Sequence, residues 1–443
     1  MVIKKKWNKI SLFLGGCLLS LAVVTSCGED DDDDSSSAAA TVAQTVTTDQ
    51  CFTYDYVHPD LACQKLLANL VIDALNKKYS TSIKNISYSA DATVETQTKI
   101  ASLGINKIVV MGDSLTSGYK HMTAGADGTI HYFTTDSYAI LLAKSLGLTP
   151  GTGDDAEFRY PATDNTTAPG TITNSSNTKS FHLLGFPSIP LSGLLDTNFS
   201  TLETVATTYN NTSLTQRIAL WRQVLRSDSS KSPAAQMAEL VPDLLVINAG
   251  NIDLLSPAST ENGLPLTTKE NFKTYYEGVI TYAKTVNPKV KLVFFKIANV
   301  GGAPSFDLKT SYNYMDKLLV DKKGSLATLL GTTLYGTTDD LLYAGGTQKA
   351  ARALDLSKDK IKLTALTPLL GGFGASADKP LTDEYWLSET ELTALNTAYT
   401  NYNSAITELQ TKYQKEENGG LDVMVVDTAD DLKTITTSGS VTK

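Results

Sequence analysis

The chain has 443 residues, is 42% hydrophobic and carries a formal net charge of −9, so it is long enough for one large domain or two small ones. It has no basic patch, which argues against nucleic acid as a partner, because binding phosphates requires clustered lysine and arginine. The four histidines and four cysteines show no metal-ligand spacing, and no phosphate-binding glycine loop is present. Neither a metal nor a cofactor is therefore expected.

Residues 1–26 are predicted to be a lipoprotein signal peptide. Lysines at positions 4, 5, 6 and 9 precede the apolar stretch ISLFLGGCLLSLAVV, which is too short for a stable membrane span. The small residues that lead into Cys27 resemble the lipobox of bacterial lipoproteins, in which the cysteine is lipidated. The resemblance implies an anchor at Cys27 in the bacterial outer membrane with the chain exposed at the surface. An ordinary cleaved signal is the alternative.

Residues 27–50 are expected to be a solvated tether. An acidic run from Glu29 to Asp34 is followed by serine, alanine and threonine, a composition that cannot form a core. Loss of the signal peptide removes four lysines and no acid, which takes the net charge from −9 to about −13. Cys51 and Cys63 then remain as an even pair in an oxidising compartment. A disulfide is favoured over two buried thiols.

Residues 51–100 are predicted to form a helical segment that packs on the main domain. Apolar residues between positions 63 and 75 recur at helical spacing, and Asp60 stands where an N-cap is expected.

Residues 101–443 alternate strand and helix patterns and so predict an α/β domain with a parallel sheet covered by helices on both faces. Continuous apolar runs at 106–112, 242–250, 289–300 and 421–427 are typical of strands buried on both faces. Helical patterns start with capping-box spacing at Thr267 and Glu270 and at Ser388 and Glu391. The polar stretch 150–180 is expected to be a surface excursion.

Ser114 is the candidate nucleophile, because GDSLTSGY follows the first buried strand directly. Ligands of parallel sheets bind beyond the carboxyl ends of the strands, where Ser114, Asn251 and Asp253 are placed. Gly112 would permit a sharp turn, and TSGY could begin a helix whose N-terminus supplies hydrogen-bond donors. A capping serine on a structural turn is the alternative.

The motif GDSLTSGY resembles the nucleophile block of the SGNH, or GDSL, ester hydrolases. The segments DSYAILLAKSLGL and LTDEYWLSETELTALNTAYTNYNSAI are similar to later parts of such proteins, and the resemblance runs from about residue 105 to the C-terminus. It implies a three-layer α/β sandwich with a flavodoxin-like parallel sheet. The motif residues Gly112, Asp113, Ser114 and Leu115 match fully, so the resemblance makes the Ser114 hydroxyl the nucleophile and its backbone amide an oxyanion donor.

The second and third blocks match in part. Gly185 and Pro187 fit the second block, but Ser188 stands where the family has a glycine whose amide completes the oxyanion hole. An amide at Ser188 can still donate if its backbone reaches the required conformation. In the third block Gly250 and Asp253 fit, whereas Ile252 occupies the position of an asparagine that donates to the oxyanion. The neighbouring Asn251 could replace it after a one-residue slip.

The family's last block, Asp-x-x-His, is expected near the C-terminus and is not found there, since no histidine follows His182. His58 is expected to be structural or exposed, and His131 to lie near the mouth of the site. His182, beside the second block, and His121, seven residues after the serine, are the candidate bases. For either of them geometry must decide.

Three functions remain open on the sequence alone. The first is a surface lipoprotein that hydrolyses lipid, short-chain or carbohydrate esters through Ser114. The second is a pseudoenzyme of the same fold that acts as a binding or surface-interaction protein. The third is a truncated chain that lacks the catalytic histidine. A fold alone does not decide between them.

Overall fold

The computed structural model describes most of the chain beyond residue 44, and residues 43–443 form one compact unit. The described residues are 45–47, 51, 58–89, 93–121, 130–131, 133, 135–164, 171–208, 211–226, 230–259, 265–299, 334–337, 351–415, 417, 420–428 and 440–442. The predicted signal peptide and Cys27 lie outside these residues, as does most of the predicted tether. Among the described residues, no helix has the length and apolarity that crossing a membrane requires.

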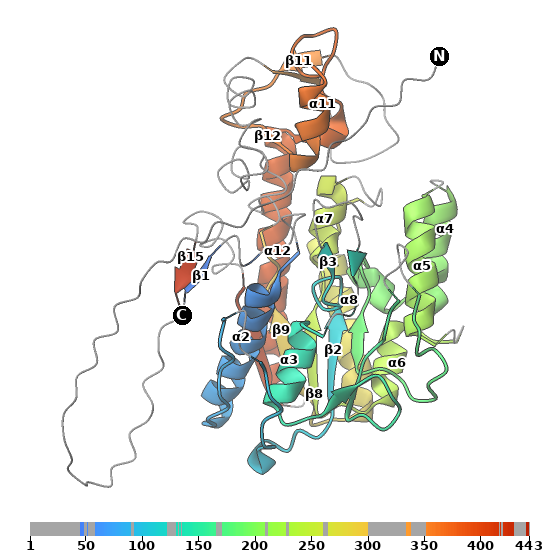
Figure 1. Ribbon diagram of the computed structural model, residues 1–443, viewed down its shortest axis with the longest axis vertical. Helices are drawn as coiled ribbons and strands as arrows, with labels where there is room; N and C mark the ends of the chain where they lie inside the picture. Colours follow the sequence, from blue (N-terminus) through green and yellow to red (C-terminus); the bar gives the residue numbers. More distant parts are fainter. Residues whose placement is uncertain are drawn as a thin grey trace, which may run out of the picture. The chain divides into compact units, whose positions relative to one another are not determined.

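A five-stranded parallel sheet forms the centre of the unit (Figure 1). Its strands are β2 (Ile108–Gly112), β7 (Leu183–Gly185), β8 (Leu244–Asn248), β9 (Lys291–Phe295) and β14 (Val423–Val426). The spatial order β14-β9-β8-β2-β7 is the 2-1-3-4-5 order of flavodoxin-like sheets. Four of these strands confirm the predicted apolar runs. The fifth, β7, was not predicted.

Right-handed crossovers decide which face of the sheet each helix covers. The connection from β2 to β7 carries α3 (Tyr138–Ser145) and runs in one direction across the sheet. The connections that lead to β8, β9 and β14 run in the opposite direction and carry α6 (Pro233–Glu239), α8 (Lys269–Val286) and α12 (Glu389–Gln414). Helix α8 packs on both α6 and α12. The result is the predicted α/β arrangement of a sheet between two helical layers.

Helix α2 (Leu61–Tyr79) comes from the N-terminal segment and packs against α3 and β14 (Figure 1). Asp60 caps it, with its carboxylate accepting the N–H of Leu61 at 2.7 Å, as the sequence predicted. Buried Leu67, Val71 and Leu75 belong to the same core as the sheet. The N-terminal segment is therefore an integral part of the α/β layer structure.

The shorter described elements complete the fold. Antiparallel pairs join β1 (Thr45–Thr47) to β15 (Ser440–Thr442), β3 (Lys120–His121) to β4 (Ile130–His131), β10 (Tyr335–Thr337) to β11 (Ala351–Ala353), and β12 (Lys360–Ile361) to β13 (Trp386–Leu387). β5 (Pro150–Gly151) and β6 (Phe158–Arg159) pair in parallel. Further helices are α4 (Ser200–Thr208), α5 (Thr212–Val224), α7 (Ile252–Ser259), α11 (Leu366–Leu370), and the 3-10 turns Ala101–Leu103, Leu191–Leu194, Thr197–Phe199, Leu363–Ala365 and Asp383–Tyr385.

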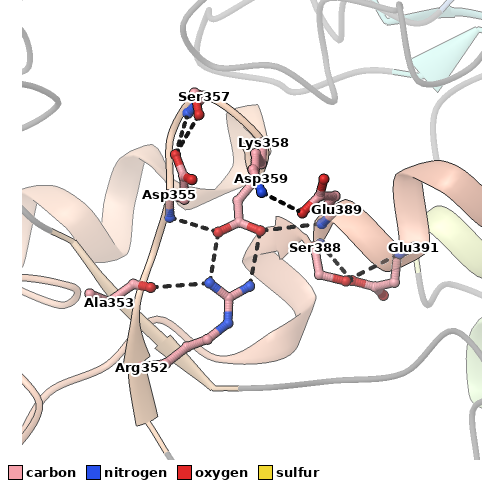
Figure 2. Close-up of polar contacts among 9 residues, drawn as sticks. All are labelled: Arg352, Ala353, Asp355, Ser357, Lys358, Asp359, Ser388, Glu389 and Glu391. Carbon is pink, nitrogen blue, oxygen red and sulfur yellow. Dashed lines mark hydrogen bonds and ion pairs between the residues drawn. The ribbon is translucent and has the colours of Figure 1, made fainter.

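A second, smaller core lies before α12 and is centred on Trp386. Arg352 packs over the Trp386 ring at 4.7 Å. Its guanidinium also forms a two-point ion pair with Asp359, at 2.8 and 2.9 Å (Figure 2). The buried Asp359 carboxylate also accepts the backbone N–H of Glu389, in the first turn of α12. Charge-assisted bonds of this two-point type are directional. They tie the small core to the start of α12.

Three predictions of local structure need correction. Ser388 and Glu391 do form the capping box of α12, but α8 is capped by Thr268, because the Thr267 hydroxyl is bonded to Asp253. Residues 114–118 form a turn, and the next helix among the described residues is α3, which begins at Tyr138. The stretch 150–180 is partly built into the core, since the side chain of Phe158 is fully buried.

Candidate active site

The nucleophile turn is built by close backbone packing at the carboxyl end of β2. A side chain at Gly112 would overlap the carbonyl of Asn248 on the neighbouring strand, and a side chain at Gly185 would overlap the backbone of Ser117. Both glycines are therefore required by space rather than by an unusual φ angle. The carbonyl of Ser114 accepts the N–H of Tyr119 at 3.1 Å and the hydroxyl of Ser117 at 3.0 Å. These bonds hold the turn without a helix.

The side chain of His58 meets the candidate nucleophile. Its Nε2 lies 2.8 Å from the Ser114 Oγ, within hydrogen-bond distance, and its ring lies 3.9 Å from the ring of Tyr119. Ser114 itself is 4% exposed, while His58 is half-buried. A base must lie within hydrogen-bond reach of the proton that it removes, and His58 meets this condition. The sequence predicts His58 to be structural or exposed, and the structure shows its side chain half-buried and in contact with Ser114.

A disulfide and a helix cap hold the segment that carries His58. Cys51 and Cys63, the pair for which a bridge was expected, are joined as a disulfide across a separation of 12 residues, with their Cα atoms 4.7 Å apart. The N–H of Asp60 donates to the carbonyl of Cys51 at 2.6 Å. Asp60 also starts α2. His58 thus lies within the loop that the disulfide closes, two residues before the N-cap of α2.

Gln64, on the first turn of α2, connects this segment to the nucleophile turn. Its buried amide nitrogen donates to the carbonyl of Pro59 at 3.4 Å, and its amide oxygen accepts the N–H of Tyr138 at 2.9 Å. The Tyr138 hydroxyl is 3.0 Å from the Oγ of Thr116, two residues after the nucleophile. A chain of polar contacts therefore runs from the residue after His58 to the nucleophile turn.

Asp113 is buried beneath the site and organises the turn from inside. One carboxylate oxygen accepts the N–H of Leu115 at 2.9 Å, and the other accepts the amide Nδ2 of Asn251 at 3.1 Å. Burial raises the pKa of Asp113 to about 6, although these hydrogen bonds and the charge of His58 act to lower the pKa. The Asp113 side chain thus positions the turn that presents Ser114.

Asn251 is directed at Asp113 by its hydrogen bonds. Its amide Nδ2 also lies 3.3 Å from the Oδ1 of Asn248, and its Oδ1 accepts the N–H of Ala298 at 3.2 Å. Ile252, in the family's asparagine position, is buried at the start of α7. The sequence left open that a one-residue slip could make Asn251 an oxyanion donor, but its hydrogen bonds instead use its side chain to support Asp113.

Ser188 has a glycine-like backbone conformation, on which its predicted role as an oxyanion donor depends. Its φ angle is +62°, in the left-handed region that glycine occupies most readily. The neighbouring residues are held firmly, with the N–H of Phe186 donating to the carbonyl of Gly112 at 2.8 Å and the indole N–H of Trp221 donating to the carbonyl of Pro187 at 3.0 Å. Ser188 therefore has the local shape of a glycine position beside the nucleophile strand.

Asp253 ties the loop after β7 to the segment before α8. Its carboxylate accepts the N–H of Leu191 at 2.8 Å and the hydroxyl of Thr267 at 2.6 Å. Burial raises the pKa of Asp253 to about 6, and the hydrogen bonds act to lower the pKa. Gly250, with φ +103°, could not carry a side chain without meeting the ring of Phe272. Asp253 and Gly250 thus help to hold the backbone around the site in place.

His182, one of the two candidate bases from the sequence, makes its described contacts with residues other than Ser114. His182 is 3% exposed, its Nδ1 accepts the N–H of Arg159 at 3.0 Å, and its ring stacks on Phe158. Burial lowers the pKa of His182 to about 3, and the charges of Arg159 and Lys107 lower it further. The prediction of His182 as the base is wrong, because its accepting nitrogen is used by the backbone. For His121 and His131, only the backbone pairing of β3 with β4 is described.

A sequence signal for His58 exists near the N-terminus, whereas the family pattern places its Asp-x-x-His block near the C-terminus. Asp55 precedes His58 by three residues, so DYVH has Asp-x-x-His spacing. Asp55 lies outside the described residues. An amphipathic helix follows His58 directly, as the periodicity of residues 61–79 indicates. A search for the spacing in the whole chain, rather than after the last strand, would have found it.

No metal centre accompanies this arrangement: within the described ranges, histidine, cysteine, aspartate and glutamate side chains do not gather in groups of three or more that could hold a metal ion. No family model matches the chain. Neither a curated protein nor a solved structure matches it significantly.

Proposed function

We propose that the chain is a serine ester hydrolase of the SGNH type, with Ser114 as nucleophile and His58 as general base. The observation that carries the proposal is the 2.8 Å contact between the His58 Nε2 and the Ser114 Oγ at the carboxyl end of the central strand. A serine hydroxyl becomes a useful nucleophile when a neighbouring base removes its proton. The sandwich fold and the 2-1-3-4-5 strand order support the proposal.

The reaction would follow from these positions in two acyl-transfer steps. The Ser114 Oγ attacks the ester carbonyl carbon while its proton passes to the His58 Nε2. The protonated His58 then donates this proton to the departing alkoxide, which leaves as an alcohol. Water attacks the acyl-enzyme with His58 again as base, and the acid is released with Ser114 restored. The backbone amides of Ser114 and Ser188 would stabilise the oxyanion.

The substrate class in this proposal is a lipid, short-chain or carbohydrate ester, and the location is the bacterial cell surface. The location rests on the N-terminal sequence, in which the lipobox-like stretch ends at Cys27 and an acidic tether follows. Lipidation at Cys27 would anchor the chain in the outer membrane. Labelling with radioactive palmitate tests this: the wild-type chain should incorporate label, and Cys27→Ser should not.

One observation favours the alternative of a binding protein with the same fold. The Asn251 amide nitrogen donates to Asp113 and Asn248, and Ile252 cannot donate at all, so the third oxyanion donor of the family is not supplied by either side chain. Loss of one such donor costs about 10² to 10³ in rate. Slow turnover with an intact serine–histidine pair would fit this alternative.

Fluorophosphonate labelling read by mass spectrometry separates the two functions. The proposal expects modification at Ser114 in the wild-type protein and none in Ser114→Ala. His58→Asn should be labelled at least tenfold more slowly, whereas His182→Asn should be labelled at the wild-type rate. A folded protein with unmodified Ser114 would contradict the hydrolase proposal. Hydrolysis of p-nitrophenyl esters with acyl chains of two to twelve carbons would then define the preferred acyl group.

A further inference from the structure

We propose that the Cys51–Cys63 disulfide regulates this site by holding His58 at Ser114, so that the site is assembled only when the two thiols are oxidised. The inference rests on the proposed function and concerns the regulation of the same site. It uses three features of the described residues: the position of the cross-link around His58, the small cluster that the cysteines form, and the separate attachment of α2 to the sheet.

The cross-link flanks the base. Cys51 precedes His58 by seven residues and Cys63 follows it by five, so the disulfide closes a covalent loop that contains the histidine. A disulfide of this span restricts the conformations that are open to the loop. On the amino-terminal side of His58, the described attachments at Cys51 are this bond and the hydrogen bond from the Asp60 N–H to the Cys51 carbonyl.

The cysteines also provide half of the local apolar cluster. Cys51, Ala62, Cys63 and Leu66 form a buried group of their own, which is separate from the main core, and Tyr88 packs against it. Such satellite clusters are smaller than the contiguous core of a domain. Reduction would remove the covalent bond between the two ends of the loop, so that the described attachments of Cys51 would be its apolar packing and the hydrogen bond from the Asp60 N–H.

Helix α2 and the nucleophile turn do not depend on the bridge. Leu67, Val71 and Leu75 are packed in the main core, and Gln64 bonds to the N–H of Tyr138 at the start of α3. Ser114 is held by the turn at the end of β2. Loss of the disulfide should therefore release His58 while the sheet, α2 and Ser114 stay in place.

The redox step is a thiol–disulfide exchange with a small or protein-borne disulfide as oxidant. The Cys51 and Cys63 thiols lose two protons and two electrons and form one sulfur–sulfur bond. The oxidant's disulfide accepts these and leaves as two thiols. Such oxidants act outside the cytoplasm. A chain that is still in a reducing compartment would then have its nucleophile without its base.

The test compares the purified oxidised protein with Cys51→Ala/Cys63→Ala, using kinetics and a measurement that does not need activity. We expect kcat to fall about 10²- to 10⁴-fold, as for loss of a general base, with KM changed less than threefold and unfolding still cooperative. Leu66→Ala is the matched control, because it disturbs the same cluster but leaves the bridge. It should lower the melting temperature with less than a fivefold change in kcat.

Carbethoxylation of His58 by diethyl pyrocarbonate, read by mass spectrometry, supplies the independent measurement. His58 should react at least fivefold faster in the double variant than in the oxidised protein, while buried His182 stays unreactive in both. An inactive oxidised protein that still shows this increase would overturn the hydrolase function but support the positioning role. Equal kcat and equal His58 reactivity in the two proteins would overturn the inference.

Discussion

Two histidines of this chain lie near the nucleophile strand in very different regions. His182 belongs to the sheet edge, where it is buried, stacked on Phe158 and hydrogen-bonded to the backbone of Arg159. His58 belongs to a disulfide-closed segment beside the sheet and remains half-buried, with Nε2 at Ser114. The difference shows that a histidine beside a motif in the sequence need not be the histidine that contacts the serine. What matters is a ring nitrogen that the backbone has not already used.

The largest expected effect tests this contrast directly. His58→Asn should lower kcat/KM for p-nitrophenyl acetate by about 10² to 10⁴, because Ser114 loses its proton acceptor. His182→Asn should change kcat/KM less than threefold, since the asparagine oxygen can still accept the N–H of Arg159. Initial rates of the two variants at pH 7.5 measure both. An equal loss in the two variants would remove the distinction between the regions.

The second largest effect is expected at Asp253, a buried carboxyl group that supports the site, and it depends on pH. The folded-state pKa of Asp253 is raised from 3.8 to about 6, so its contribution to stability is full below about pH 4 and is lost as the pH rises through 6. Two pKa units correspond to about 3 kcal/mol. Relative to wild type, Asp253→Asn should therefore gain about 3 kcal/mol between pH 4 and pH 7.

Urea denaturation of wild type and Asp253→Asn at several pH values measures this gain. The asparagine oxygen can accept the N–H of Leu191, and its amide can donate to the hydroxyl of Thr267, so both contacts are kept. Thr267→Ser, which keeps the hydroxyl and the charge, is the control and should follow the wild-type pH dependence. Parallel pH profiles for wild type and Asp253→Asn would contradict the raised pKa.

Asn251→Ala should have a smaller effect, which separates a supporting role from a catalytic one. The variant leaves a carboxylate oxygen of Asp113 and the N–H of Ala298 without their present partner, at a cost of about 1–3 kcal/mol in the free energy of unfolding. Because its amide is used by Asp113, kcat should fall less than tenfold. A loss of about 10² or more in kcat at unchanged stability would make Asn251 an oxyanion donor.

The smallest expected effect is at Ser188. Since its φ angle is +62°, Ser188→Gly should change the free energy of unfolding by less than about 1 kcal/mol and leave kcat within twofold. Ser188→Val places a β-branched residue in the same conformation and should lower the free energy by roughly 1–3 kcal/mol. Denaturation curves and initial rates test both. Equal stability of the glycine and valine variants would show that the conformation is not retained.

Much of the frame was predictable because its signals are local. The buried runs at 106–112 and 242–250 became β2 and β8, and the capping box at Ser388 started α12 where expected. The three-residue strand β7 carries too short a pattern to be recognised. The turn after Ser114 was mistaken for a helix because the packing of Gly112 and Gly185 against neighbouring backbone is a tertiary effect.

The proposed base, His58, could not be found from the same signals because its contact with Ser114 is not local. His58 and Ser114 are 56 positions apart, and a helix and further chain lie between them. The role of Asn251 was equally hidden, since it depends on the approach of β8 to β2. The Asp-x-x-His spacing at 55–58 precedes the first strand of the sheet, whereas the family pattern has this spacing after the last strand.

The pairing of β1 with β15 has a consequence for how this fold is connected. Thr45–Thr47 and Ser440–Thr442 lie side by side as antiparallel strands, and α2 packs on both β14 and α3, where a helix that continues from the last strand would cover the sheet. The described fold is thus close to a ring. A circular permutant that carries residues 45–95 after residue 443 through a short linker would preserve every contact between His58 and Ser114. The order of His58 and Ser114 along the chain thus depends on where the ring is opened, whereas the contact between them does not.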